Sequence, residues 1–455
     1  MSRRSDAWAL VLLLLSALGS AGVAFAVQAA LARTLHADQY GHFASALATL
    51  TIVAPAVGFG LPSVWLKLYG TEGWAAARWM RASARFVCIS SIACVAATLA
   101  WSFFGVRDIE TTRLIVWMLP ALLSPGAIEL ASARFQLEER FGLVAAWQAF
   151  QHCARLGVVL VCYLLNARVD NVAIGFGCIG IIVIAGGVWT LSPLFKGRLR
   201  LAGHGERPAP GSATQAAALP GVGELWHGAY PFGVTSLLYF GYVQSGLLLV
   251  AYLTSPGRVA LYSVALTILA AIYLFPTVLF QKLLMPRLHR WAAANDARLH
   301  QSYRTGNRCM LAAGLVAGLA TALLAPVLIP AVFGEHYREA VPLVVIMSAC
   351  APLRFVTTSA SSIMTSRNQI QILNGCMGAA FVCSIVAAML LVPRFDLKGA
   401  AGAFVFGEAV WTVLIVIAAN RIMQNRQRRR DAACAQAAGR RPGERVARTV
   451  ESEAT

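Results

Sequence analysis

Long apolar runs alternate with short polar gaps along almost the whole chain. Each run is 20 residues or longer, whereas a membrane-spanning strand needs only about 9–11 residues with alternating polarity. About 20 apolar residues carry a helix across a bilayer. We therefore predict an all-α polytopic membrane protein with twelve transmembrane helices. The predicted spans are residues 8–32, 42–66, 86–106, 114–133, 141–165, 171–195, 225–253, 259–281, 309–333, 340–364, 369–392 and 399–420.

The first run could be confused with a signal peptide, because Arg3 and Arg4 precede it. It is uncharged from Trp8 to Ala32, which is 25 residues. The apolar region of a signal peptide is about 7–15 residues long. We interpret this run as a first transmembrane helix that is retained in the mature protein.

The distribution of basic residues predicts the orientation. With the N-terminus in the cytoplasm, 28 of the 38 Lys and Arg residues fall in cytoplasmic segments, eight fall outside and two fall within spans. Cytoplasmic loops of membrane proteins carry such an excess of Lys and Arg. We expect a multi-pass membrane protein with both termini in the cytoplasm.

The longest internal gap, residues 196–223, is rich in Gly, Ala, Pro and basic residues and is typical of a flexible linker. It separates a six-helix N-terminal lobe, residues 1–195, from a six-helix C-terminal lobe, residues 224–423. Short matches between the halves, such as Arg168–Asp170 with Arg394–Asp396, favour a parallel repeat. Residues 424–455 form a basic tail that we expect to be disordered and cytoplasmic.

Composition excludes several classes of function. Charged residues make up 13% of the chain, against about 25% in soluble domains. The net charge of +18 comes from short gaps between apolar runs, not from a folded basic face, so a nucleic-acid partner is not expected. The ten cysteines show no C-x-x-C pair, so we expect neither a zinc site nor a disulfide framework. Gly175, Gly177 and Gly180 match a dinucleotide fingerprint only inside an apolar span, where close helix packing explains them. We expect no cofactor, no metal and no catalytic residue.

Two arginines lie deep within predicted spans. Arg155 and Arg354 are each 14 residues into their span, near the middle of the bilayer. An arginine there costs at least about 2.5–3.5 kcal/mol, so it must face a polar cavity or a partner. Gln148 and Gln151 precede Arg155 on roughly the same helical face. Either the arginines form a cationic site for an anionic substrate, or each is paired with a buried carboxylate.

Four further residues are candidates for the transport site. Glu129 and Glu408 lie in apolar spans, where a carboxyl could couple transport to an ion or could simply neutralise an arginine. Lys67 and Lys282 end two spans on the predicted cytoplasmic side. They could meet a lipid phosphate at the cavity mouth or extend to the membrane interface. The basic tail is suited to contact with anionic membrane lipids.

Several stretches resemble the polysaccharide-export flippases, the O-antigen translocases of the multidrug/oligosaccharidyl-lipid/polysaccharide exporter superfamily. The matching stretches occur in both halves and in the order found in that family. They are Leu31–Phe43 (LARTLHADQYGHF), Gly58–Ser63 (GFGLPS) with Lys67, Ala260–Ala265 (ALYSVA), Met285–Leu288 (MPRL), Val332–Leu343 (VFGEHYREAVPL) and Leu397–Ala403 (LKGAAGA).

The resemblance implies two six-helix lobes around a central, often cationic cavity that opens alternately to each side. It implies a polyprenyl-pyrophosphate-linked oligosaccharide as substrate, for exopolysaccharide, capsule or O-antigen synthesis. A polysaccharide polymerase and chain-length machinery are the partners that such a pathway suggests. The alternatives are a cation-coupled multidrug exporter of the same superfamily, which would need acidic cavity residues, or a membrane-embedded polymerase, which would need large extramembrane loops.

The charge bias generates a test of topology. Reporter fusions at Gly211 in the linker and after Arg430 in the tail should both report a cytoplasmic location, because the segments that carry them hold most of the basic residues. A periplasmic signal from either fusion would contradict the twelve-span arrangement.

Overall fold

The computed structural model describes residues 3–195, 199, 201, 220–277, 298–362, 364 and 367–438, and helix occupies most of the described part of every predicted span. The helices of the N-terminal half are α1 (Arg3–Thr34), α2 (Ala37–Val53), α3 (Leu61–Glu72), α4 (Met80–Phe104), α5 (Ile109–Leu137), α6 (Phe141–Leu164) and α7 (Val169–Phe195). Those of the C-terminal half are α8 (Val222–Leu253), α9 (Pro256–Thr277), α11 (Arg298–Phe333), α12 (Val341–Met347), α13 (Cys350–Ser361) and α14 (Arg367–Ala438). Most of the predicted linker lies outside the described residues.

The number of spans agrees with the sequence pattern. Among the described residues, seven helical stretches are long and apolar enough to cross a membrane, and the α12–α13 pair, bent by 49°, makes an eighth. Two of the seven, Ala37–Phe104 and Gln369–Asn425, each contain two predicted spans. Together with α1 and α6, these stretches account for the twelve predicted helices.

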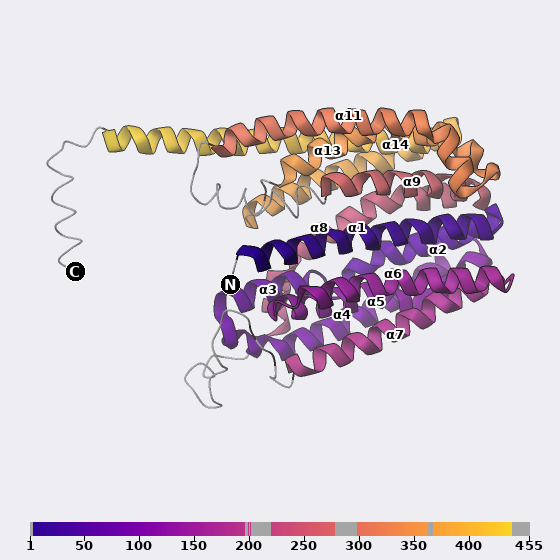
Figure 1. Cartoon of the computed structure of the whole chain (residues 1–455), viewed down its shortest axis with the longest axis horizontal. Coiled ribbons are helices and arrows are strands. Elements are labelled where there is room, and N and C mark those ends of the chain that lie inside the picture. The colour runs from indigo at the N-terminus through magenta and orange to yellow at the C-terminus, as the bar shows by residue number, and fades with distance from the viewer. Residues whose placement is uncertain are drawn as a thin grey trace.

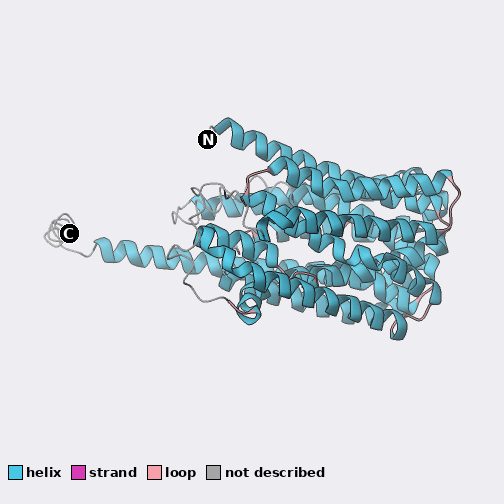
Figure 2. Ribbon diagram, turned by 90° about the horizontal axis from the view of Figure 1, so that it is seen from below, coloured by secondary structure: helices cyan, strands magenta, loops and turns pink. Residues whose placement is uncertain are grey.

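The helices form two lobes that lie side by side with their axes roughly along the long direction of the molecule (Figures 1 and 2). In the first lobe α5 packs on α7 and α1 on α6; in the second α8 packs on α14 and α11 on α13. The lobes meet where α2 contacts α8 and α9, and where α1 contacts α9. The start of α1 and the end of α14 lie at the same end of the bundle (Figure 1). We call the opposite end, with the α1–α2 and α8–α9 connections, the far end.

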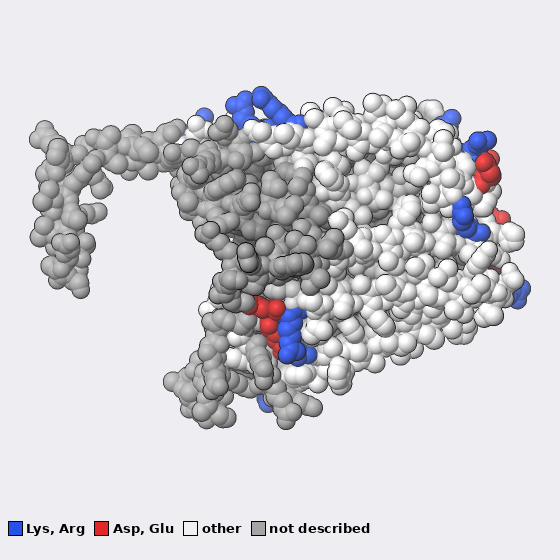
Figure 3. Space-filling view, in the orientation of Figure 1, with Lys and Arg blue, Asp and Glu red and all other residues white. Residues whose placement is uncertain are grey.

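Charged side chains gather at the two ends of the bundle, and a broad uncharged belt separates them on the face seen in Figure 3. Such a belt matches the hydrocarbon core of a bilayer, in which an unpaired charge is costly. The structure therefore supports a membrane-spanning orientation of the helices. Which side of the membrane holds the termini remains a prediction from the basic residues.

The predicted span 42–66 is broken into α2 and α3. Pro55 lacks a backbone N–H, and Gly58, Phe59 and Gly60 all adopt positive φ angles of 74°, 35° and 77°. A Cβ on Gly60 would lie 2.7 Å from the backbone nitrogen of Gly233 in α8. The break therefore allows close contact between the start of α3 in one lobe and α8 in the other.

The C-terminal half contains a second break, within α14. Asp396 has φ 53° and ψ −136°, which separates two helical spans, and its carboxylate pairs with Arg258 of α9. Beyond the last span the helix continues to Ala438, through most of the first half of the tail that we expected to be disordered. This stretch is rich in Arg, Gln and Ala, which favour helix, and it contains no Gly or Pro.

Glycine allows the lobes to touch at the far end. A Cβ on Gly41 in α2 would lie 1.8 Å from the carbonyl oxygen of Pro256, the first residue of α9. No side chain larger than hydrogen fits there while this contact is maintained. Gly41 therefore sets the distance of closest approach between the lobes.

We predict that Gly41→Ala forces the far ends of the lobes apart. The measurement is the distance between spin labels on Cys introduced at Leu165 and Phe395, two exposed far-end positions in different lobes, with the ten native cysteines replaced. A longer distance should dominate in the variant. Gly22→Ala is the matched control, because no atom lies within 4 Å of its added Cβ. An unchanged distance in Gly41→Ala would contradict the role of this contact.

Candidate functional site

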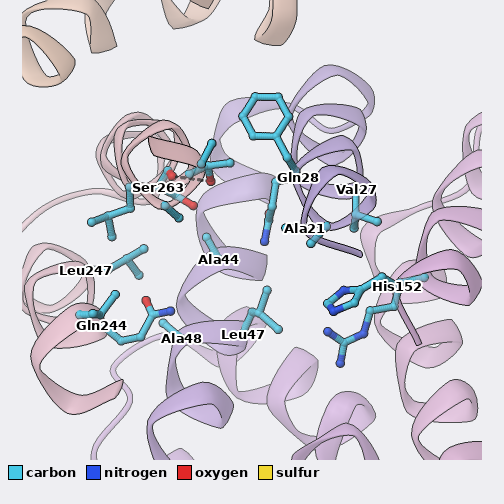
Figure 4. Close-up of a pocket in the computed structure, with 18 of the residues that line it drawn as sticks. Ala21, Val27, Gln28, Ala44, Leu47, Ala48, His152, Gln244, Leu247 and Ser263 are labelled. Atoms are coloured by element: carbon cyan, nitrogen blue, oxygen red, sulfur yellow. Dashed lines mark hydrogen bonds between the residues drawn. The ribbon is translucent and has the colours of Figure 1, made fainter. Parts of the chain in front are cut away.

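A cavity of about 340 Å³ lies between the two lobes (Figure 4). We call it the central cavity. It is lined by residues of α1, α2, α6 and α7 from one lobe and by α8 and α9 from the other: Ala21, Ala24, Phe25, Val27, Gln28, Ala44, Leu47, Ala48, His152, Arg155, Phe176, Val243, Gln244, Leu247, Ser263, Leu266, Thr267, Ala270, Ala271 and Leu274. Its volume falls within the range of small-molecule sites, about 300–1,000 Å³. The cavity exists because many of its lining side chains are small, and a few polar groups project into it.

Arg155 is the charged residue of this lining. It lies near the middle of α6, and its guanidinium carbon lies 5.1 Å from the centroid of the Phe176 ring in α7. Its Nε is buried without a hydrogen-bond partner among the described residues, and none of them forms an ion pair with it. No carboxylate is among the described residues that line the cavity. The central cavity therefore has a positive charge that no described group neutralises.

Other polar groups also line the cavity. His152 precedes Arg155 by one helical turn and lies on one side of the space, while Gln244 lies on the other and Gln28 projects between them (Figure 4). Amide and imidazole groups can donate hydrogen bonds to phosphate or sugar oxygens. The arrangement can therefore bind an anionic or hydroxyl-rich ligand.

The glutamines near Arg155 have different environments. Gln148 is exposed one turn before His152, whereas Gln151 is buried and its amide nitrogen donates to Ser124 Oγ of α5 at 2.7 Å. The helical period of 3.6 residues places Gln148 and Gln151 on roughly the same face of α6, so it could not predict that one is exposed and the other buried. Gln151 thus joins α6 to α5 and does not line the cavity.

Tyr40 of α2 contacts two residues of the central-cavity lining. Its hydroxyl lies 3.2 Å from Gln28 Oε1 of α1 and 3.3 Å from Ser263 Oγ of α9, so it joins the two lobes. Its ring also packs edge-on against Tyr337, with centroids 6.1 Å apart. Sequence reasoning missed Tyr40, Gln28 and Gln244. A polar residue inside an apolar span was the available signal, but its orientation depends on how the lobes pack.

Arg354 has a different environment from Arg155. Its NH2 donates to Glu408 Oε1 at 2.6 Å within the C-terminal lobe, and the two side chains are 7% and 0% exposed. The guanidinium carbon also lies 4.5 Å from the Tyr273 ring centroid and 4.6 Å from that of Trp411. Arg354 does not line the central cavity. The two arginines that the sequence grouped together are thus placed in separate environments.

The remaining candidates lie apart from the central cavity. Lys67 is exposed on α3, toward the end of the bundle that holds the termini, and Lys282 lies outside the described residues. Glu129 is exposed on α5 and forms no ion pair or hydrogen bond with any described residue. Glu408 is occupied by Arg354, with Tyr273 Oη 3.5 Å from the same carboxylate oxygen. A coupling role for either carboxylate stays a prediction.

The Arg354–Glu408 pair generates a test of stability. Arg354→Ala leaves a buried carboxylate without its cation, which we expect to lower the free energy of unfolding by about 3–5 kcal/mol. The measurement is the thermal unfolding of the purified protein in detergent. The double variant Arg354→Ala/Glu408→Gln should recover part of the loss, because a neutral amide is less costly to bury. Equal stability of wild type and Arg354→Ala would contradict a structural role for the pair.

Comparison with known proteins identifies the fold but not a closely related sequence. No protein-family model matches the chain, and no curated protein matches it in sequence. Among solved structures, the lipid II flippase MurJ in an inward closed conformation matches with a TM-score of 0.67 and 10% identity, covering 90% of this chain and 87% of that one. A multidrug resistance MATE family transporter of the MOP superfamily in an inward-facing conformation matches with a TM-score of 0.65 and 11% identity, covering 92% and 99%.

A third matched structure is a transporter whose description refers to the polarity of its binding pocket. It is a MOP superfamily transporter from Pyrococcus furiosus Vc1 (DSM3638), for which reverse polarity of the binding pocket suggests a different function. It matches with a TM-score of 0.60 and 11% identity, covering 92% of this chain and 96% of that one. The chain described here therefore has the two-lobe, twelve-helix fold of the MOP-superfamily transporters.

Proposed function

We propose that this protein is a membrane transporter that moves a polyprenyl-pyrophosphate-linked oligosaccharide from the cytoplasmic to the periplasmic leaflet by alternating access. The fold supports membrane transport, because the matched structures of this fold are transporters and a flippase. The proposed substrate class rests on Arg155, whose charge in the cavity between the lobes is not neutralised by any described residue. This positive charge favours a substrate with an anionic group.

A pyrophosphate fits this environment chemically. It carries more than one negative charge, and the planar guanidinium of arginine can bind phosphate oxygens through two parallel hydrogen bonds. His152, Gln28 and Gln244 supply further donors around the same space. The rest of the lining is largely apolar, with side chains such as Leu47 and Leu247. Within the described lining, the site for an anionic group is therefore beside Arg155.

The same charge argues against the nearest alternative. A cation-coupled multidrug exporter needs acidic groups to attract a cationic drug, and the described residues of the central cavity include none. Two carboxylates lie elsewhere in the spans, and one of them, Glu408, already has an arginine partner.

A polymerase is the second alternative, and it would need extramembrane loops large enough to hold catalytic residues. The described far-end connections are short: residues 35–36, 105–108, 165–168 and 254–255 each join two helices directly. They offer little room for a catalytic domain.

The resemblance of the sequence to polysaccharide-export flippases gives the proposal its biological setting. We place the protein in the bacterial inner membrane with cytoplasmic termini, serving exopolysaccharide, capsule or O-antigen synthesis. A polysaccharide polymerase and chain-length machinery are its proposed partners. Lys67 and Lys282 are proposed to meet the lipid phosphate at the cytoplasmic mouth.

Substitution of Arg155 tests the proposal. Removing a hydrogen bond to a charged group costs about 1.5–3 kcal/mol, which corresponds to roughly a 10- to 150-fold loss of affinity. We expect Arg155→Ala to weaken binding of polyprenyl pyrophosphate to the purified protein by this factor and to lower polysaccharide export in cells. Arg155→Lys should lose less, because it keeps the charge but not the planar geometry.

The control for this experiment is Arg168→Ala, at an exposed arginine in the α6–α7 connection. It should bind and export like wild type. Membrane abundance is measured for every variant, so that loss of protein is not mistaken for loss of transport. Normal export and binding by Arg155→Ala at normal abundance would exclude the proposed role of the cavity.

A further inference from the structure

A second cavity, of about 730 Å³, lies between the lobes toward the far end. We call it the far cavity. Helix α2 separates it from the central cavity, because Ala44 and Ala48 face the central cavity while His42, Ser45 and Thr49 face the far cavity. The remaining walls come from the end of α4, the start of α5, and parts of α8, α9 and α14. Nothing in the transport site described above uses its polar groups.

One histidine in this cavity contacts two carboxylates through different ring nitrogens. His42 Nδ1 lies 2.7 Å from Asp108 Oδ2, and His42 Nε2 lies 3.5 Å from Glu110 Oε2. The His42 side chain is 14% exposed, against 41% for Asp108 and 52% for Glu110. The hydrogen-bond partner of the ring is Thr111 Oγ1, 3.1 Å from Nδ1, while the two carboxylates lie at ion-pair distance. A neutral imidazole carries no charge for them to pair with, whereas an imidazolium is attracted to both. An additional proton on the cluster therefore completes two ion pairs.

The same geometry argues against a metal. The two ring nitrogens point away from each other, so the two carboxylates cannot converge with one nitrogen on a single ion. No group of three His, Cys, Asp or Glu side chains suited to a metal was found among the residues that the structure describes. A proton is the cation that this cluster can bind.

The other ionisable groups near His42 come from α2, α8 and the α4–α5 connection. Of the other ionisable groups on the far cavity, Arg107 is turned toward Tyr252 of α8, to whose hydroxyl its NH2 donates at 2.8 Å. In the described lining, α4, α9 and α14 add no ionisable side chain. Asp38, one turn before His42 on α2, lies beside Gly257 of α9.

Asp108 is anchored as well as charged. Desolvation raises the pKa of Asp108, but hydrogen bonds from Thr111 and the charge of His42 outweigh it and leave the pKa below its ordinary value. Thr111 donates its backbone N–H to Asp108 Oδ2 at 2.9 Å, which caps the start of α5. The carboxylate therefore stays ionised near neutral pH.

This cluster adjoins contacts between the lobes. Arg107, next to Asp108 in the α4–α5 connection, stacks over the Tyr252 ring of the other lobe at 4.0 Å. Gly41, next to His42, touches Pro256 of the other lobe. Any change that loosens the α4–α5 connection also loosens a contact that holds the far ends together.

We propose that His42, Asp108 and Glu110 form a proton-binding site accessible from the far side of the membrane, and that a proton bound there holds the far ends of the lobes together. A protonated His42 joins α2 to both carboxylates and fixes the α4–α5 connection, with Arg107 on Tyr252. Without the proton, the ring has no charge to attract the carboxylates, the connection loosens, and the far end opens more readily. This inference rests on the proposed alternating access, and it names a cation that regulates the cycle.

The direction of the pH dependence follows from linkage. Because the closed far end binds the proton more tightly, the ratio of closed to open molecules falls as pH rises, by at most about tenfold per pH unit for one proton. Histidine changes charge between about pH 5 and 8. The experiment measures the distance between spin labels at Leu165→Cys and Phe395→Cys, in the full chain with its native cysteines replaced, in liposomes from pH 5 to 8.

We expect the short distance to dominate at pH 5 and a longer one to grow toward pH 8. His42→Gln, which cannot be protonated, should show no response in this range. Glu110→Gln, at a half-exposed position, should shift the midpoint to lower pH because one carboxylate no longer favours the imidazolium. His336→Gln is the matched control, at an exposed far-end histidine whose ring is tilted by 47° against that of Tyr337, and should respond like wild type.

A wild-type distance that is constant from pH 5 to 8, or a full response in His42→Gln, would overturn the proposal. The readout needs no substrate. A negative result for the His42 cluster therefore does not change the interpretation of the Arg155 binding and export results. A negative result for Arg155 likewise does not change the interpretation of the distance measurement.

Discussion

Burying charge in an apolar surrounding is expensive, and this cost organises the interior of the protein. Arg354 meets it with Glu408 and a set of aromatic rings inside one lobe. Arg155 has no such partner among the described residues and lies instead on a cavity between the lobes. A buried arginine without a counterion needs water or an anionic ligand. The same physical constraint thus yields a structural pair in one lobe and a candidate binding site in the other.

Helix α2 connects these features. One of its faces lines the central cavity, the opposite face lines the far cavity, and Gly41 between them packs against the α9 backbone of the other lobe. Tyr40 on the same turn bridges Gln28 and Ser263 across the lobes. A movement of α2 would therefore change both cavities and the closure of the far end together. The proposed alternating access requires coupling of this kind, because a substrate site and a gate must not open to both sides at once.

Polar contacts join the two lobes at the far end. In the present structure Arg33 of α1 donates from Nε to the carbonyl oxygen of Val332 at 2.7 Å, adding a hydrogen bond between the lobes beside Tyr40 and Arg107. These bonds are few and polar, so they can break and re-form without disrupting the apolar packing inside each lobe.

The sequence by itself determined the fold class, because apolar runs long enough to cross a bilayer leave helix as the only economical way to satisfy the backbone. It also located the arginines of interest, since a charge in an apolar run is visible without any structure. It could not separate Arg155 from Arg354, because pairing with Glu408 depends on contact between helices 54 residues apart in the chain. His42, Asp108 and Glu110 were likewise invisible as a group until α2 and α5 were packed together. Tertiary structure decided which charges are neutralised and which face a cavity, because the free energy of a charge depends on its surroundings in space.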